Sequence, residues 1–178
     1  MPRNRRPVDR AEKRDEIVTA ATRLFTEVGY DESSMAKVAA AAGVTSNTIY
    51  WYFADKDALL VAVLDELLAE ALSEMAARAQ EPWVDQALWA VERLERYSRL
   101  VTVVHARAAA SPAIGTWHDG FHALADAYLA EGLTKAGVAP EDVDAVSRTA
   151  VFVVEGLLVH PLPDDQRRTI FELISRPR

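Results

Sequence analysis

Apolar residues recur every three to four positions along most of this chain, which is the spacing of amphipathic helices. The first such stretch runs from about Asp9 to Val28, and Gly29 follows it as a residue that readily ends a helix. Similar stretches cover residues 56–79, 83–107 and 112–135, and others follow Pro140 and Asp164. No segment alternates apolar and polar residues as a half-buried strand does. The pattern therefore predicts an all-α protein.

Local signals set the expected helix boundaries in the second half of the chain. Glu81-Pro82 ends the helix over 56–79, and we expect a bend within 97–99. The helix over 112–135 is expected to be interrupted or loosened near Gly115 and Gly120, because glycine weakens a helix interior, and to end at Gly137. We further expect Pro140 to open one helix and Asp164 to cap the last.

Residues 33–56, SSMAKVAAAAGVTSNTIYWYFADK, form the most informative stretch. Ser34 is a candidate N-cap for a short helix that ends near Ala42, and Gly43 suits the turn that follows. Thr45 is a second candidate N-cap, for a helix that ends near Tyr52. Three apolar side chains would face inward on this second helix: Val44, Ile49 and Phe53. The stretch predicts two helices joined by a tight turn.

The second of these helices carries an unusual outer face. Hydroxyl, amide and aromatic groups remain on the outside once the apolar residues face inward: Ser46, Asn47, Thr48, Tyr50, Trp51 and Tyr52. Exposed aromatic side chains indicate a contact surface. Hydroxyls and amides reach base edges or phosphates, and aromatic rings contact thymine methyls or sugars. The arrangement is that of a DNA-binding helix-turn-helix.

These residues resemble the signature of the tetracycline-repressor (TetR) family of transcriptional regulators. The matching positions are Gly43-Val44-Thr45, the run 48–53 (TIYWYF), and Lys56 with Leu59 and Leu60. The likeness extends back to Phe25, Gly29 and Tyr30, and so covers about the first 65 residues. It departs at Ser33 and Ser34, where threonines are usual, and at Asn47, where glycine is common.

The resemblance implies a three-helix DNA-binding domain followed by a helical ligand-binding and dimerisation domain, about nine helices in all. We place the division between residues 1–56 and 57–178. The expected DNA contacts come from the turn, the second helix and the flanking cations: Ser34, Lys37, Thr45, Ser46, Asn47, Thr48, Tyr50, Trp51, Tyr52 and Lys56. Arg3, Arg5 and Arg6 form a short basic arm, which is either a solvated tail or a further contact along phosphates or in the minor groove.

The net charge of −7 is unevenly distributed. Residues 1–56 hold nine basic and eight acidic side chains, whereas the remainder holds 11 basic and 19 acidic ones. A basic end on an acidic body fits a protein that meets nucleic acid at one end. The chain has no cysteine, no secretory signal and no membrane-length apolar run, so we expect a cytoplasmic protein with no disulfide or thiolate metal site.

Large side chains in the second domain suggest a small-molecule site, since such sites are apolar cavities with a few polar groups. Tyr128 belongs to this group of large side chains, and the candidate lining residues are Trp83, Trp89, Tyr97, His105, Trp117, His118, Phe121, His122 and Phe152. The first candidates among them are Trp117, His118, Phe121 and His122. Ordinary core packing is the alternative for each. The resemblance implies an inducer that binds there and resets the spacing of two DNA-reading helices.

The last two helices are the expected homodimer interface. Their apolar stripe is wider than one packing face requires, and Ala150 with Gly156 permits close approach between helices. Dimerisation through these helices is also what the resemblance implies. The alternative is that they close the core of the single chain.

The remaining alternatives are a metal-binding helical protein and an architectural DNA-binding protein without a sensing role. His118 and His122 would share one helix face, but the sequence H-D-G-F-H lacks the glutamate of the zinc-protease motif H-E-x-x-H. No Ser-His-Asp order or glycine-rich phosphate loop is present. We therefore assign no catalytic residue, no metal site and no cofactor, and expect a transcriptional repressor that binds a palindromic operator and is released by a small molecule.

Overall fold

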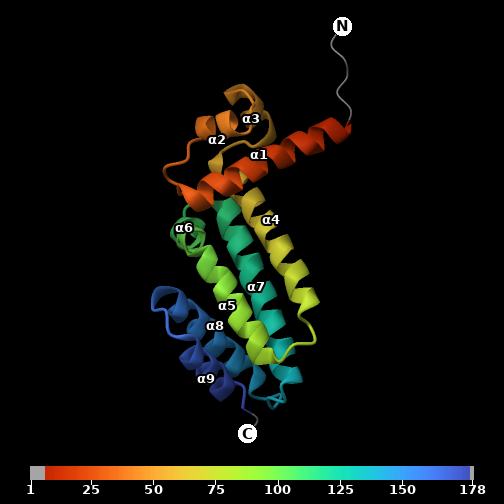
Figure 1. The fold of residues 1–178 in the computed structure, drawn as a ribbon, viewed down its shortest axis with the longest axis vertical. Coiled ribbons are helices and arrows are strands. Elements are labelled where there is room, and N and C mark those ends of the chain that lie inside the picture. Colours follow the sequence, from red (N-terminus) through yellow and green to blue (C-terminus); the bar gives the residue numbers. More distant parts are fainter. Residues whose placement is uncertain (1–6, 177–178) are drawn as a thin grey trace. The chain divides into compact units, whose positions relative to one another are not determined.

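A computed structural model describes residues 7–176, which form nine α-helices and no strands (Figure 1). The all-α prediction is confirmed. The helices are α1 (Pro7–Glu27), α2 (Met35–Ala41), α3 (Ser46–Tyr52), α4 (Lys56–Ala77), α5 (Trp83–Arg96), α6 (Ser98–Ala108), α7 (Pro112–Lys135), α8 (Val143–Val159) and α9 (Asp164–Ile174). The arm that holds Arg3, Arg5 and Arg6 lies outside the described residues.

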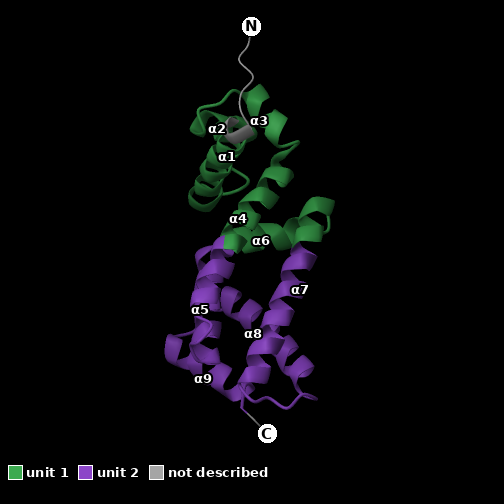
Figure 2. Cartoon of the chain, turned by 90° about the vertical axis from the view of Figure 1, so that its right-hand side faces the viewer, with its two compact units in different colours: residues 1–69, 99–117 green, residues 70–98, 118–178 purple. Residues whose placement is uncertain are grey.

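The helices pack into two compact units, coloured separately in Figure 2. The first unit holds the chain up to Ala69 together with Arg99–Trp117, so α6 and the start of α7 join the N-terminal helices. Its core is apolar and well buried, and includes Ile17, Phe25, Val38, Ile49, Leu60, Val63, Leu100 and Ile114. The expected functional division between residues 56 and 57 differs from this packing division and stays a prediction.

The second unit holds Glu70–Ser98 and the chain from His118 onward. In it α5 contacts both α8 and α9, and α8 contacts α9. The core of this unit is built on Trp83, Val91, Leu133, Leu157 and Phe171. The α5–α6 break falls at Tyr97, within the predicted bend.

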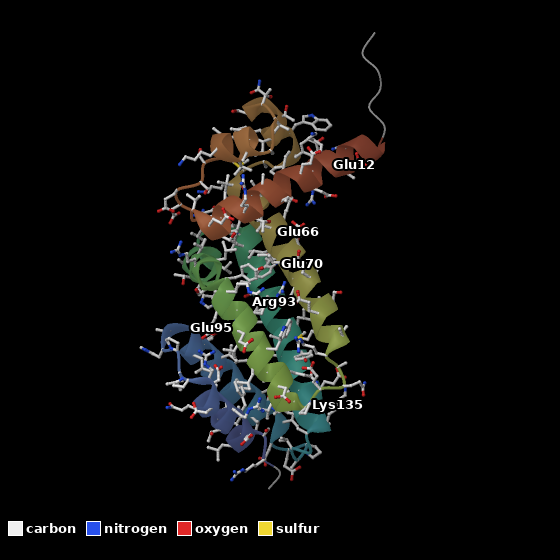
Figure 3. All side chains as sticks on the ribbon, viewed as in Figure 1. Glu12, Glu66, Glu70, Arg93, Glu95 and Lys135 are labelled. Atoms are coloured by element: carbon white, nitrogen blue, oxygen red, sulfur yellow. The ribbon has the colours of Figure 1, made fainter. Side chains whose placement is uncertain are left out.

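Two nearly buried arginines connect helices of the second unit. Arg93 of α5 donates to Glu74 at 2.5 Å and to Glu70 at 3.2 Å, both on α4. Arg93 and Glu70 are labelled in Figure 3. Arg167 of α9 donates to Glu95 of α5 at 2.8 Å and to the backbone carbonyl of Leu162. Because a buried guanidinium without partners is costly, these pairs fix the register between the helices that carry them.

Helix α7 corrects one prediction, since it runs without a break from Pro112 to Lys135. A Cβ placed on Gly120 would meet no atom within 4 Å, so this glycine lies on an open side of an intact helix. A Cβ on Gly132 would instead lie 2.6 Å from Cε3 of Trp83. Gly132 is therefore required by the close packing of the indole ring, and Gly137, at φ +89°, ends the segment as predicted.

Two predicted helix starts are also wrong. Pro140 leads a turn, and α8 begins three residues later at Val143. Asp164 is the first residue of α9, not its cap, and no side chain caps that helix. Neither helix has a side-chain hydrogen bond at its N-cap, so the capping signal expected from the sequence does not set either start.

The two glycines of α7 give a matched test of this packing. Gly132→Ala should destabilise the fold by about 1–3 kcal/mol, because the new methyl group overlaps the Trp83 ring. Gly120→Ala should stabilise it by about 0.5–1 kcal/mol through helix propensity. Denaturant unfolding followed by circular dichroism measures both. Equal effects of the two substitutions would contradict the role assigned to Gly132.

Candidate nucleic-acid interface

The predicted helix-turn-helix is present as α2 and α3. The Ser34 hydroxyl accepts from the Lys37 amide at 3.2 Å and caps α2, and the Thr45 hydroxyl accepts from the Thr48 amide at 3.2 Å and caps α3. Gly43 adopts φ +66° in the turn, a conformation that other residues reach with strain. The two caps and the glycine explain why this sequence forms two short helices at this point.

One face of α3 is buried and holds the helix in place. Ile49 is fully buried, Phe53 is nearly so, and Val44 is partly buried against the same core. A seven-residue helix is not stable by itself, so its position depends on these contacts. The inward set predicted from the sequence is the set that packs.

The opposite face of α3 is open to solvent. Trp51 is 66% exposed and Tyr50 55% exposed, and Ser46 and Asn47 are exposed with them. Thr48 is half-buried, and its hydroxyl lies 2.9 Å from that of Thr45. Tyr52 was expected on the outside but is half-buried and packs in part against the core. The candidate reading surface is therefore formed by Ser46, Asn47, Tyr50 and Trp51.

The two lysines predicted to contact phosphate have different surroundings. Lys37 is exposed, and its Nζ donates to the Glu32 carbonyl at 2.7 Å. Lys56 is half-buried, with Nζ 3.9 Å from the centroid of the Tyr30 ring. This burial lowers the pKa of Lys56. Both lysines stay predicted phosphate contacts, but Lys56 also supports the packing of Tyr30.

Two arginines of α1 belong to the candidate interface and were missed by the sequence analysis. The guanidinium carbon of Arg10 lies 4.4 Å from the centroid of the Trp51 ring, and that of Arg14 lies 5.3 Å from the Phe53 ring. Both distances are within cation–π range. The i, i+4 spacing of Arg10 and Arg14 was a usable signal, because it places both on one face of α1.

A polar network joins three segments below α3. Arg107 of α6 donates to both carboxylate oxygens of Asp57, at 3.0 and 2.7 Å, and the Tyr30 hydroxyl donates to the same carboxylate. The Arg107 bond is the main reason why the pKa of Asp57 falls to about 2, and the bond from Tyr30 acts in the same direction. Burial and the Asp57 carboxylate raise the pKa of Tyr30, which remains a neutral donor.

The candidate ligand residues are divided between the two units. In the first unit, Trp117 is half-buried and donates to Asp65 at 2.9 Å, and His105 is exposed on α6. In the second unit, Trp83 lines a cavity of about 630 Å³ formed by the end of α4, the start of α5 and the end of α7. The cavity is also lined by Leu72, Met75, Gln86, Tyr128 and Glu131, among others.

The other candidates of the second unit have different environments. Trp89 is half-buried beside Arg78, and Tyr97 is half-buried beside Arg93. Phe121 is half-buried next to His122, with ring centroids 5.9 Å apart. Phe152, on α8, is 71% exposed. Trp83 is thus the candidate that lines this cavity, while Tyr128 and Gln86 join it there.

Comparisons with known proteins agree with the geometry of α2 and α3. Residues 17–63 match the family described as bacterial regulatory proteins, tetR family. The chain is 22% identical over 191 residues to the uncharacterised HTH-type transcriptional regulator YvdT of Bacillus subtilis, covering 96% of this chain and 97% of that protein. It is 37% identical over 67 residues to the class A tetracycline repressor from transposon 1721 of Escherichia coli.

The match to the tetracycline repressor covers 38% of this chain and 31% of that protein, so it concerns the N-terminal segment. Among solved structures, a TetR transcription regulator from Haloarcula marismortui superposes with a TM-score of 0.77 at 18% identity, over 93% of this chain and 97% of that one. Fold and motif together define a helix-turn-helix protein of the transcription-regulator class. The match to the TetR family lies in residues 17–63, and the likeness of the whole chain to solved TetR-type regulators is a likeness of fold.

No helix within residues 7–176 combines the length and the apolar character that crossing a membrane requires.

The Asp57 network predicts how stability depends on pH. Because folding lowers the pKa of Asp57 from 3.8 to about 2, its contribution is complete above about pH 4 and is lost as the pH falls toward 2. Allowing for the exposure of Arg107, this contribution is on the order of 1–2 kcal/mol. Asp57→Asn should remove it.

The measurement is the free energy of unfolding of the wild type and of Asp57→Asn at neutral pH and near pH 2. The difference between the two proteins should be large at neutral pH and close to zero at the acid end. Asp126→Asn, at an exposed position of α7, is the control. A difference that does not change with pH would show that Asp57 acts through packing alone.

Proposed function

We propose that this protein is a transcriptional repressor that binds a palindromic DNA operator as a homodimer and leaves it when a small molecule binds. The observation that carries the proposal is the exposed face of α3. Asn47, Tyr50 and Trp51 are held outward by a helix whose opposite face is buried at Ile49. Amide, hydroxyl and aromatic groups on one rigid, narrow helix match the donor and acceptor pattern of the major groove.

The base contacts come from Ser46, Asn47 and Trp51, with some from Thr48. Phosphate contacts come from Ser34, Lys37, Tyr50, Tyr52 and Lys56, and Arg10 adds a further one from α1. The side-chain amide of Asn47 can pair with adenine through two hydrogen bonds. Arg10 lies 4.4 Å from the centroid of the Trp51 ring, and a guanidinium beside an aromatic ring can still donate N–H groups to a phosphate oxygen.

Dimerisation is supported by apolar side chains exposed on α8 and α9. Phe152 and Val159 of α8 are each 71% exposed, and Leu173 of α9 is 54% exposed. Large exposed hydrophobic groups on adjacent helices are typical of a protein interface. A twofold interface made by α8 and α9 presents two copies of α3, which is why the operator is proposed to be a palindrome.

Release by a small molecule is supported by the cavity of the second unit. Its volume of about 630 Å³ lies within the range that drug-sized ligands occupy. Leu72, Met75 and Trp83 provide an apolar wall, and Gln86 and Tyr128 provide hydrogen-bonding groups. Small-molecule control distinguishes this proposal from an architectural role in DNA packaging.

Selection of DNA from a randomised pool by the purified full-length chain tests the proposed function. Enrichment of one palindrome, bound by two chains and resistant to random competitor, is the expected outcome. Enrichment without a consensus would indicate an architectural protein. No binding at low salt would contradict DNA binding altogether, because non-specific phosphate contacts are strongest there.

Arg10 and Arg23 provide a matched test of the interface, since both are exposed arginines of α1. Arg10→Ala should weaken binding to specific and random DNA alike and lower the salt-dependence slope by about one unit. Arg23→Ala should have little effect, because Arg23 lies about 20 Å further along the helix. Binding isotherms at several salt concentrations measure this slope. An unchanged slope for Arg10→Ala would remove Arg10 from the interface.

A further inference from the structure

Two histidines of the second unit converge on one point. Helix α7 passes through His118 and His122 without a break, so the two residues lie one turn apart on the same helix face. Their Nε2 atoms are 3.1 Å apart, and the ring centroids are 4.4 Å apart at an interplanar angle of 64°. Both side chains are half-buried. The rings are thus turned so that the same nitrogen of each faces the other.

This separation fits two ligands of one metal ion. Zinc binds imidazole nitrogen at about 2.0–2.1 Å with tetrahedral geometry, which places two such nitrogens about 3.3 Å apart. The observed Nε2–Nε2 distance of 3.1 Å is slightly shorter, and a small rotation of either ring would bring the two nitrogens to the zinc-binding separation. Without a metal, the contact needs a proton on one Nε2 and a lone pair on the other.

The neighbouring carboxylate favours the tautomer that a metal requires. Asp119 Oδ1 lies 3.6 Å from Nδ1 of His118. A negative charge on that side favours the proton on Nδ1 and leaves the lone pair on Nε2, as carboxylates commonly do behind metal-binding histidines. Asp119 is 88% exposed, so this influence is modest.

We propose that His118 and His122 bind one divalent transition-metal ion through their Nε2 atoms. Imidazole suits zinc, copper and nickel, whereas magnesium and calcium prefer oxygen ligands. Two protein ligands leave other coordination positions for water or for oxygen and nitrogen donors of a bound small molecule. This property is separate from DNA binding, and it does not depend on the function proposed above.

The test is metal binding by the full-length chain, prepared without a polyhistidine tag. Calorimetric titration with Zn²⁺ and with Ni²⁺ should show a saturable site of about one ion per chain. His118→Gln and His122→Gln should each weaken this site at least tenfold, since each removes one of the two ligands. His160→Gln is the matched control, because His160 lies at the exposed C-cap of α8 in the same unit.

Two readouts keep the outcome independent of folding. Helicity and the unfolding midpoint without metal should be similar in all variants, and added Zn²⁺ should raise the midpoint only where both histidines are present. Nitrogen NMR of the rings should show Zn²⁺ shifting the Nε2 resonances of both His118 and His122. Unchanged affinity in the His118→Gln/His122→Gln double variant would overturn the proposal. So would an equal loss in His160→Gln, or Mg²⁺ binding as tight as that of Zn²⁺.

Discussion

The ion pair between Asp57 and Arg107 is the long-range polar constraint on which the first unit depends. It joins the first turn of α4 to the end of α6 across 50 residues of sequence. The Tyr30 hydroxyl donates to the same carboxylate and so connects the segment that follows α1. Asp57 is mainly buried, with 19% of its side chain exposed, so loss of Arg107 would leave a poorly solvated carboxylate. The lowered pKa of Asp57 reflects the same interaction, because the bond from Arg107 stabilises the charged carboxylate relative to the protonated form.

The position of α3 follows from this arrangement. Helix α4 begins four residues after α3 ends, and Asp55 caps it by accepting from the Ala58 amide at 2.7 Å. A helix as short as α3 gains little stability from its own hydrogen bonds. It is held by its buried residues, its Thr45 cap and the fixed start of α4. Its outer residues are therefore unconstrained by folding and available for recognition.

The sequence predicted the local structure of this region well because each signal acts over a few residues. Ser34, Gly43 and Thr45 all perform the capping or turn role that their chemistry suggested. The buried face of α3 followed from helical spacing. A prediction failed in α7, which is unbroken although it contains two glycines expected to interrupt or loosen it, because a single glycine weakens a long helix without ending it.

Contacts between distant residues were beyond the reach of periodicity. Nothing in the spacing of Arg93 indicated its partners Glu70 and Glu74, and the shared helix face of Arg10 and Arg14 did not indicate that Arg10 contacts Trp51. The candidate ligand residues show the same limit. Their residue types suggested a pocket, but the structure places Trp83 at the cavity of the second unit together with Tyr128 and Gln86.

The arginines of the two units illustrate how one residue type serves opposite purposes. Arg93 and Arg167 are nearly buried, and their N–H groups donate to carboxylates of neighbouring helices. Each of these arginines therefore neutralises acidic groups of the body. Arg10 and Arg14 instead lie over aromatic rings, within cation–π distance. Stacking on an aromatic ring positions the guanidinium but does not neutralise its charge, and its N–H groups can still donate to another partner. A net charge of −7 is therefore compatible with positive charge beside α3, because Arg93 and Arg167 of the body are paired with carboxylates whereas stacking does not neutralise Arg10 and Arg14.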